Sequence, residues 1–125
     1  MWIQHPRLGA FSIVLADNLD THQPNPDVVM LRARRVEHLR LLREACPSLA
    51  DAEIIESGPH HDYFWRIIAP KTSFVEALGV LGKGLDYRNV KDTAHAAEVR
   101  VGTQFVQALH RIWSTLNAIQ RLSSH

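Results

Sequence analysis

The chain has a single cysteine, Cys46, among its 125 residues. One thiol excludes an internal disulfide and the paired CxxC spacing of redox and structural zinc sites. The chain also lacks an apolar run near the roughly 20 residues that cross a bilayer, and its N-terminus lacks the basic start and apolar centre of a secretory signal. These absences predict a protein of a reducing compartment, the cytoplasm, with no membrane partner.

A strong charge of either sign is also missing. The chain has 14 Lys and Arg residues against 13 Asp and Glu residues, which gives a formal net charge of +1. This balance excludes a polycation that coats nucleic acid or an anionic membrane without a defined site, so any anion-binding site must be local. Lysine is scarce, since 11 of the 14 basic residues are arginine. That composition fits a GC-rich genome as well as bidentate recognition of anions.

The length and the 46% apolar content are typical of one globular domain, which we expect to span residues 1–125. Four short segments rich in β-branched and aromatic residues predict strands, namely residues 10–16, 28–35, 52–57 and 63–69. Three segments with helical periodicity predict helices, namely residues 36–46, 73–85 and 96–120. Ser73 and Glu76 have the spacing of a capping box at the start of the second helix.

The predicted order of elements is β-β-α-β-β-α-α. We therefore expect an α+β fold of two layers, in which two hairpins form a four-stranded antiparallel sheet and the helices pack on one face. The other face must meet water, a ligand or another subunit. Residues 86–92 are expected to form an ordered loop between the second and third helices.

Arginine side chains are concentrated on two of the predicted strands. Because side chains alternate between the faces of a strand, Arg32 and Arg34 share one face of the second strand, and Arg66 lies on the fourth. If these faces coincide, three guanidinium groups converge on the uncovered side of the sheet. Each guanidinium presents a planar fork of donors that suits a phosphate or a carboxylate. Tyr63 offers a ring on which a base could stack.

These arginines could instead be neutralised within the sheet. Glu53, Glu56 and Asp62 lie on or beside the third and fourth predicted strands. A cross-strand ion pair with one of them would leave no charge for a ligand. The two interpretations therefore differ in whether the open face keeps spare positive charge.

Tyr87, Asn89 and Lys91 alternate along the expected loop at residues 86–92. Asn89 and Lys91 could donate to the same anion, with Tyr87 as a stacking ring. The competing interpretation is that the asparagine hydrogen-bonds its own backbone, as Asn often does in turns.

The chain has eight histidines, of which only His60 and His61, followed by Asp62, are close in sequence. Adjacent residues of a turn rarely ligate one ion, and no HExxH or paired Cys/His spacing is present, so no metal is predicted. His61 or Asp62 could act as a general base. Exposed turn histidines without a chemical role are the simpler interpretation. No P-loop, GxGxxG or nucleophile motif predicts a cofactor or a known enzyme class.

The apolar side chains carry two further predictions. Cys46 lies on the apolar stripe of the first predicted helix, which is typical of a buried, inert thiol. Trp2, Trp65 and Trp113 are expected to anchor the core or an interface. The last helix is apolar over more than a narrow stripe, which favours a homodimer or a contact with another protein.

A pattern of short motifs runs through nearly the whole chain and includes Met1-Trp2-Ile3, Gly9-Ala10-Phe11-Ser12, Leu31-Arg32-Ala33-Arg34, Asp62-Tyr63 with Arg66, and Asp86-Tyr87-Arg88-Asn89-Val90-Lys91. In this pattern the sequence resembles a family of small uncharacterised bacterial proteins of about this size. The resemblance implies no activity, substrate or cofactor.

Three functions follow as hypotheses. The first is a non-enzymatic binding module that recognises an anionic partner, either single-stranded nucleic acid or an acidic protein surface, through the arginines of the sheet. The second is a protein–protein role, such as a dimeric inhibitor protein of a mobile element. The third is an enzyme acting on a phosphorylated or carboxylated small molecule, with His61 or Asp62 as the base.

Overall fold

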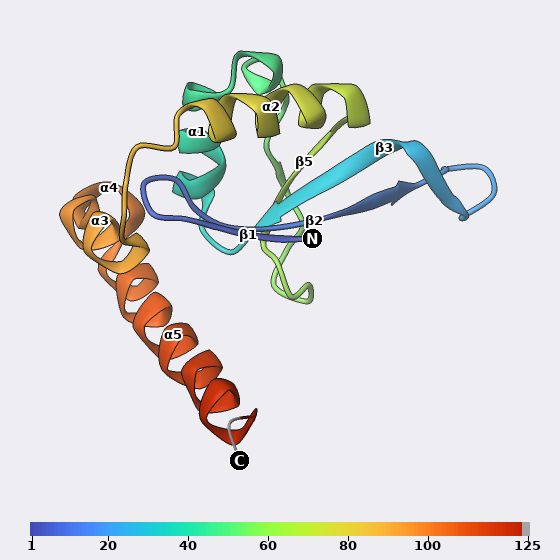
Figure 1. The fold of residues 1–125 in the computed structure, drawn as a ribbon. Coiled ribbons are helices and arrows are strands. Elements are labelled where there is room, and N and C mark those ends of the chain that lie inside the picture. Colours follow the sequence, from blue (N-terminus) through green and yellow to red (C-terminus); the bar gives the residue numbers. More distant parts are fainter. Residues whose placement is uncertain (124–125) are drawn as a thin grey trace.

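The computed structural model describes residues 1–123 and shows an α+β fold built on an antiparallel sheet (Figure 1). The strands are β1 (Trp2–His5), β2 (Gly9–Asp17), β3 (Pro24–Ala33), β4 (Ile55–Glu56) and β5 (Trp65–Pro70). The helices are α1 (Val36–Ala45), α2 (Lys71–Lys83), α3 (Val90–Ala96), α4 (Glu98–Val101) and α5 (Thr103–Ser123), with a short 3-10 helix, η1 (Pro47–Leu49), after α1.

The strands lie in the order β1-β2-β3-β5-β4, and each neighbouring pair is antiparallel. The predicted α+β class and both predicted hairpins, β2–β3 and β4–β5, are confirmed. The predicted number of four strands is wrong, because β1 adds a fifth and changes the predicted order of elements. Pairing with β2 makes this four-residue segment a strand, with Trp2 opposite Ser12. No local alternation of apolar and polar residues indicated it.

One face of the sheet is covered by helices, as predicted. Val29, Leu31 and Ala33 of β3 point toward this face and are buried, while the side chains between them are less buried. Figure 1 shows α1 and α2 lying over the same side of the sheet. Their apolar side chains join one core cluster with those of the strands, including Leu39, Leu42, Phe74 and Ala77.

Cys46 and η1 follow α1 directly and contact α2. Cys46 is fully buried and is a free thiol, which confirms the prediction from its place on the helical stripe. Burial raises the pKa of this thiol, because the thiolate would lose its hydration. Cys46 therefore behaves as a small apolar residue of the core.

The starts of two helices differ from the prediction. The capping box is wrong, because α2 begins at Lys71 directly after β5, and Ser73 lies inside its first turn. The N-cap position is Pro70, whose side chain has no oxygen to accept a hydrogen bond from the start of the helix, so the box does not form. Residues 86–92 are only partly a loop, since α3 begins at Val90.

The predicted helix at residues 96–120 is two helices. Gly102 separates α4 from α5. Its φ of 96° is a backbone conformation that residues other than glycine rarely adopt. Phe105, Val106 and Leu109 of α5 are buried against the body of the protein. The rest of α5 projects away from the body (Figure 1). No helix within residues 1–123 has the length and the apolar content needed to cross a membrane.

Candidate anion-binding site on the open sheet face

The two arginines at the centre of the open face are direct neighbours. In the register of the sheet, Arg32 of β3 stands opposite Arg66 of β5 on one side and opposite Ser12 of β2 on the other. The same row continues to Trp2 at the sheet edge. All four side chains therefore project from the face that α1 and α2 leave uncovered.

Like charges placed directly opposite each other on neighbouring strands are destabilising. Arg32 donates a hydrogen bond from Nη2 to Ser12 Oγ at 2.8 Å, and Arg66 has only a long contact of 3.8 Å from Nη1 to Met30 Sδ. The Nε atoms of both arginines are buried and donate to no acceptor in the described part of the chain. This cationic pair therefore has unused donor capacity.

No carboxylate of residues 1–123 forms an ion pair with Arg32, Arg34 or Arg66. The interpretation that Glu53, Glu56 or Asp62 neutralises these arginines is thus not what the structure shows. Arg32 and Arg66 share an open face and retain their positive charge, as the anion-binding interpretation required.

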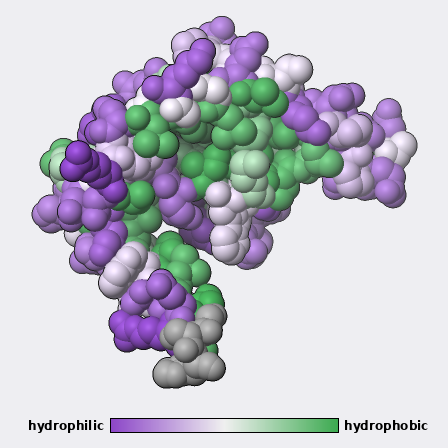
Figure 2. Space-filling view, viewed as in Figure 1, coloured by the Kyte–Doolittle hydropathy of each residue, from purple (hydrophilic) through white to green (hydrophobic). Residues whose placement is uncertain are grey.

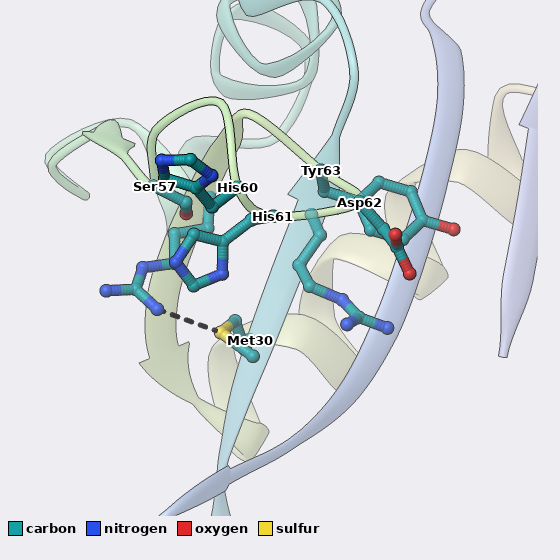
Figure 3. Close-up of a pocket in the computed structure, with 8 residues that line it drawn as sticks. Met30, Ser57, His60, His61, Asp62 and Tyr63 are labelled. Atoms are coloured by element: carbon teal, nitrogen blue, oxygen red, sulfur yellow. Dashed lines mark hydrogen bonds between the residues drawn. The ribbon is translucent and has the colours of Figure 1, made fainter.

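The loop between β4 and β5 lines a pocket together with the arginine pair. The cavity has a volume of about 310 Å³. Figure 3 shows Ser57, His60 and His61 on one side of it, Asp62 and Tyr63 on the other, and Met30 at its floor. The pocket thus unites the histidine turn with Arg32 and Arg66. These two guanidinium groups carry a formal charge of +2, against −1 for Asp62.

Tyr63 contacts two arginines, Arg32 of β3 and Arg34, which follows directly after the strand ends at Ala33. The Arg32 Cζ atom lies 4.7 Å from the centroid of the Tyr63 ring, and the Arg34 Cζ atom lies 4.2 Å from it. Both guanidinium groups therefore make cation–π contacts with one ring, which limits their rotation. Arg34 does not line the pocket of Arg32 and Arg66 but lines a second groove, and Tyr63 lies on the wall of both.

The predicted donors of the 86–92 segment lie elsewhere. Tyr87 packs edge-on against His5, with ring centroids 6.0 Å apart, and lies under Arg7. The Asn89 side chain caps α3 by accepting a hydrogen bond from the Asp92 backbone N–H at 2.9 Å. This confirms the interpretation that Asn89 bonds its own backbone.

Lys91 also contacts a residue away from the arginine pair. Its Nζ atom lies 3.8 Å from the centroid of the Trp113 ring on α5. Neither Lys91 nor Tyr87 nor Asn89 lines the arginine pocket. The candidate site therefore contains Arg32, Arg66 and Tyr63 of the predicted set, with Arg34 next to it.

Several residues of the site could not be assigned to it from the sequence alone. Ser12 and Met30 contact the arginines only because the strand register brings them there, and a single sequence does not show the register. Ser57 and His60 line the pocket from the loop between β4 and β5, whose path a single sequence does not show. A cluster of His and Ser in a turn directly before an Arg-bearing strand was the available signal.

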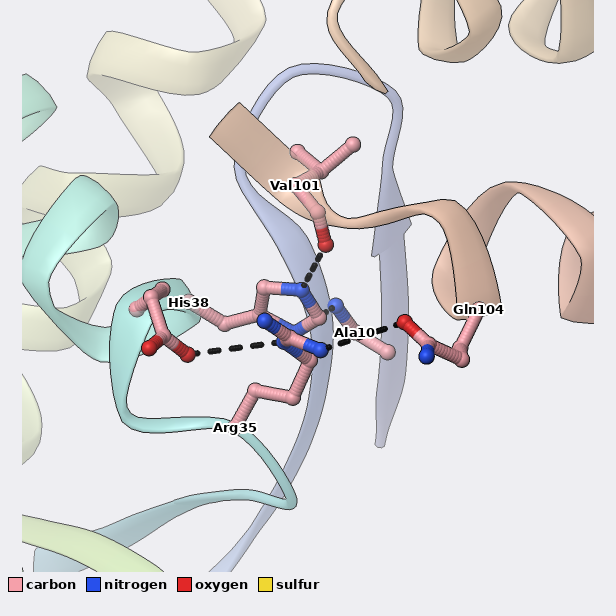
Figure 4. Close-up of polar contacts among 6 residues, drawn as sticks. Ala10, Arg35, His38, Val101 and Gln104 are labelled. Atoms are coloured by element: carbon pink, nitrogen blue, oxygen red, sulfur yellow. Dashed lines mark hydrogen bonds and ion pairs between the residues drawn. The ribbon is translucent and has the colours of Figure 1, made fainter. Parts of the chain in front are cut away.

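A second polar cluster is buried on the helical side, around His38 of α1 (Figure 4). His38 Nδ1 accepts a hydrogen bond from the Ala10 backbone N–H at 3.3 Å. The neutral ring therefore carries its proton on Nε2, which donates to the Val101 carbonyl at 2.8 Å. Burial lowers the pKa of His38. The cluster ties β2, α1 and α4 together and does not touch the arginine pocket.

Within residues 1–123 there is no group of three or more His, Cys, Asp or Glu residues that could hold a metal ion. No family model, curated protein or solved structure matches the chain. The resemblance to a family of small bacterial proteins therefore stays a prediction. Function must be inferred from the geometry of the site.

Proposed function

We propose that the protein is a non-enzymatic binding module that holds a phosphate group of single-stranded nucleic acid between Arg32 and Arg66. The observation that carries this proposal is the cross-strand arginine pair, which has no carboxylate partner in the described chain. An anion in the pocket would relieve the repulsion between the two guanidinium groups and accept hydrogen bonds from their free donors.

The shape of the site favours a phosphate over a carboxylate. Donors surround the cavity on several sides, because two arginines come from the sheet while Ser57, His60 and His61 come from the loop. A phosphate group has acceptor oxygens pointing in several directions, whereas the two oxygens of a carboxylate lie in one plane. The acidic protein surface that was the other predicted anion is therefore the weaker candidate.

Aromatic side chains on the same face favour single-stranded nucleic acid. Trp2 stands in the same row as Arg32 and is 78% exposed. Tyr63 lies beside the arginines at the border of the pocket. Combining cationic groups that contact the backbone with aromatic rings that stack on bases is the usual way to bind single strands.

The enzyme hypothesis has one supporting observation, since His61 and Asp62 line the same cavity as the arginines. A general base is usually oriented by a second group. No hydrogen bond joins His61 to Asp62 in the described chain, so we favour binding without turnover. We also propose that binding takes place in the cytoplasm, because the only cysteine is a buried free thiol.

The test measures the fluorescence anisotropy of a labelled single-stranded RNA and DNA oligonucleotide of mixed sequence in 50 mM salt. We expect Arg32→Ala and Arg66→Ala each to weaken binding about tenfold, because each removes charge-assisted hydrogen bonds to one phosphate. The slope of log K against log salt should become shallower by about 0.7 for each phosphate that the variant no longer neutralises.

Arg40→Ala is the matched control, since Arg40 is exposed on α1, on the covered side of the sheet. It should leave the affinity within about twofold. Three results would refute the proposal: no binding in 50 mM salt, an equal loss in the control, or preferential binding of an acidic polypeptide such as polyglutamate. Turnover of a phosphorylated substrate that is lost in His61→Ala would support the enzyme hypothesis instead.

A further inference from the structure

The projecting half of α5 carries an exposed apolar seam. Ile112, Leu116 and Ile119 continue the line of buried Leu109 at spacings of three, four and three residues, so they share one face of the helix. Leu116 and Ile119 are 58% and 56% exposed, and they are flanked by Trp113, which is 52% exposed, and Leu122, which is 76% exposed. Figure 2 shows apolar side chains at the surface along this part of the molecule.

Such a seam points to a partner. A helical segment of about 12–15 residues is marginally stable in water on its own, and helices in proteins gain most of their stability by burying an apolar face. Beyond Leu109 the large apolar residues of α5 are exposed instead. Continuous exposed apolar surface of this kind marks an interaction site more often than a solvated one.

The seam also forms one wall of a groove. Ile112 and Leu116 face Trp2, Arg34 and Tyr63 of the open sheet face across a space of about 420 Å³. From Ile112 to Leu122 the apolar face extends over about 15 Å of helix. This length matches about three turns of a second helix, whose apolar side chains would enter the groove.

The charge around the seam selects the kind of partner. Residues 103–123 contain no Asp or Glu but two arginines, Arg111 and Arg121. The ammonium group of Lys91 lies over Trp113, and Arg34 is the charged residue of the groove. A second copy of the chain would bring the same positive helix to this surface, whereas an acidic partner would complement it.

We propose that the α5 seam and its groove bind an amphipathic helix of another protein that carries Asp or Glu on either side of its apolar stripe. This groove adjoins the arginine pocket, since Tyr63 lines both, but Leu116 and Ile119 of the seam do not line the arginine pocket. The apolar stripe would supply the affinity, and the carboxylates would supply the preference for this partner.

The experiment selects binders from a displayed library of amphipathic helical peptides with a fixed Leu/Ile stripe and random flanking positions. Selection uses the full chain, with counter-selection on the double variant Leu116→Gln/Ile119→Gln. We expect enriched peptides to carry Asp and Glu at the flanks and to bind the double variant at least tenfold more weakly. Val99→Gln, which changes an almost fully exposed residue of α4, should bind them like the wild type.

A second variant tests the charge complementarity separately from the fold. In Arg111→Glu, the preference at the flanks that lie nearest to position 111 should shift from acidic to basic residues. Enrichment of neutral or basic flanks on the wild-type chain would overturn the proposal, as would the absence of any peptide that distinguishes the double variant.

Two other occupants of the seam are tested on the same variants. A wild-type dimer in sedimentation velocity that becomes a monomer in Leu116→Gln/Ile119→Gln would overturn the proposal in favour of a second copy. Binding to vesicles of phosphatidylglycerol that the double variant loses would overturn it in favour of a lipid surface. Oligonucleotide binding should be unchanged in the double variant, so this proposal and the phosphate proposal can fail separately.

Discussion

The imidazole ring of His38 fills the space beside the backbone of Gly9. A Cβ atom on Gly9 would overlap the ring, and Gly9 has a φ of 116°. The next residue, Ala10, donates its backbone N–H to the same ring (Figure 4). One histidine therefore docks the start of β2 onto α1, and its contacts contribute to the stability of the fold.

Gly9→Ala should destabilise the protein by about 2 to 4 kcal/mol, because the new methyl group meets the ring and the backbone conformation is strained. Gly79→Ala is the matched control, since Gly79 lies inside α2 with open space around it. It should stabilise the protein by about 0.5 to 1 kcal/mol. Urea unfolding of the two variants measures both changes, and equal effects would show that Gly9 tolerates a side chain.

His38→Leu should lower the free energy of unfolding by about 2 to 4 kcal/mol. The substitution keeps an apolar side chain in the core but leaves the Ala10 N–H and the Val101 carbonyl without a partner. Urea unfolding with detection by circular dichroism measures the change. A loss below about 0.5 kcal/mol would mean that water replaces the imidazole and that the cluster contributes little.

The stability of the protein should fall as the pH drops below about 6.5. Burial holds the pKa of His38 in the fold below its ordinary value of 6.5, so the unfolded chain binds more protons than the folded one in this range. The stabilisation is thus complete above pH 6.5 and is lost as the pH falls toward the lower pKa of the folded state. Burial and Arg7 lower the pKa of His5 as well, which adds a change of the same sign.

The measurement is the free energy of unfolding at pH 7.5, 6.5 and 5.5 for the wild type and for His38→Gln. The free energy of unfolding of the variant should depend less steeply on pH, and the dependence that remains should come from His5. Asp86 does not contribute in this window, because Arg7 lowers the pKa of that carboxyl below its usual acidic value. Stability that rises toward pH 5.5 would contradict the neutral form of His38.

Asn89→Ala should cost about 1 kcal/mol of stability, because Asn89 caps α3 through the Asp92 N–H. The affinity for a single-stranded oligonucleotide should stay within twofold of the wild type, since Asn89 does not line the arginine pocket. Asn89→Ser, which retains a capping oxygen, should restore most of the stability. Loss of affinity without loss of stability would show that Asn89 contributes to oligonucleotide binding.

Tyr63→Ala should weaken oligonucleotide binding by about fivefold to tenfold, because a ring that contacts two guanidinium groups and can stack on a base is removed. Tyr63→Phe keeps the ring and should retain most of the affinity. Anisotropy titrations in 50 mM salt compare the two variants. If Phe and Ala weaken binding equally, the hydroxyl group of Tyr63 matters and its ring does not.

Local patterns in the sequence predicted much of the fold. The alternation in β3 separated Val29 and Leu31 from Arg32 and placed the arginines on the open face. It did not indicate β1, because a strand of four residues is stabilised by its partner strand. Nor did periodicity show that α5 leaves the body after Leu109, since the apolar spacing is the same in the covered and the uncovered half.

The candidate site was predicted only as a set of residue types. The residue type and the alternation of side chains along each strand predicted that Arg32 and Arg66 belong to it. Strand register decided that the two arginines stand directly opposite each other and that Arg32 donates a hydrogen bond to Ser12. The path of the loop between β4 and β5 decided that His60 and His61 line the same pocket. The donors expected at residues 89 and 91 were instead used for the cap of α3 and for the contact with Trp113.

By itself, the sequence determined which side chains share a face within each strand and helix, because the period of the backbone sets that relation locally. Only the tertiary structure decided which faces meet, since strand register and helix docking depend on contacts between residues far apart in the chain. For this protein the difference is large. The local pattern places an arginine on each of two strands, and the register alone sets them opposite each other, where neither forms an ion pair with a carboxylate of residues 1–123.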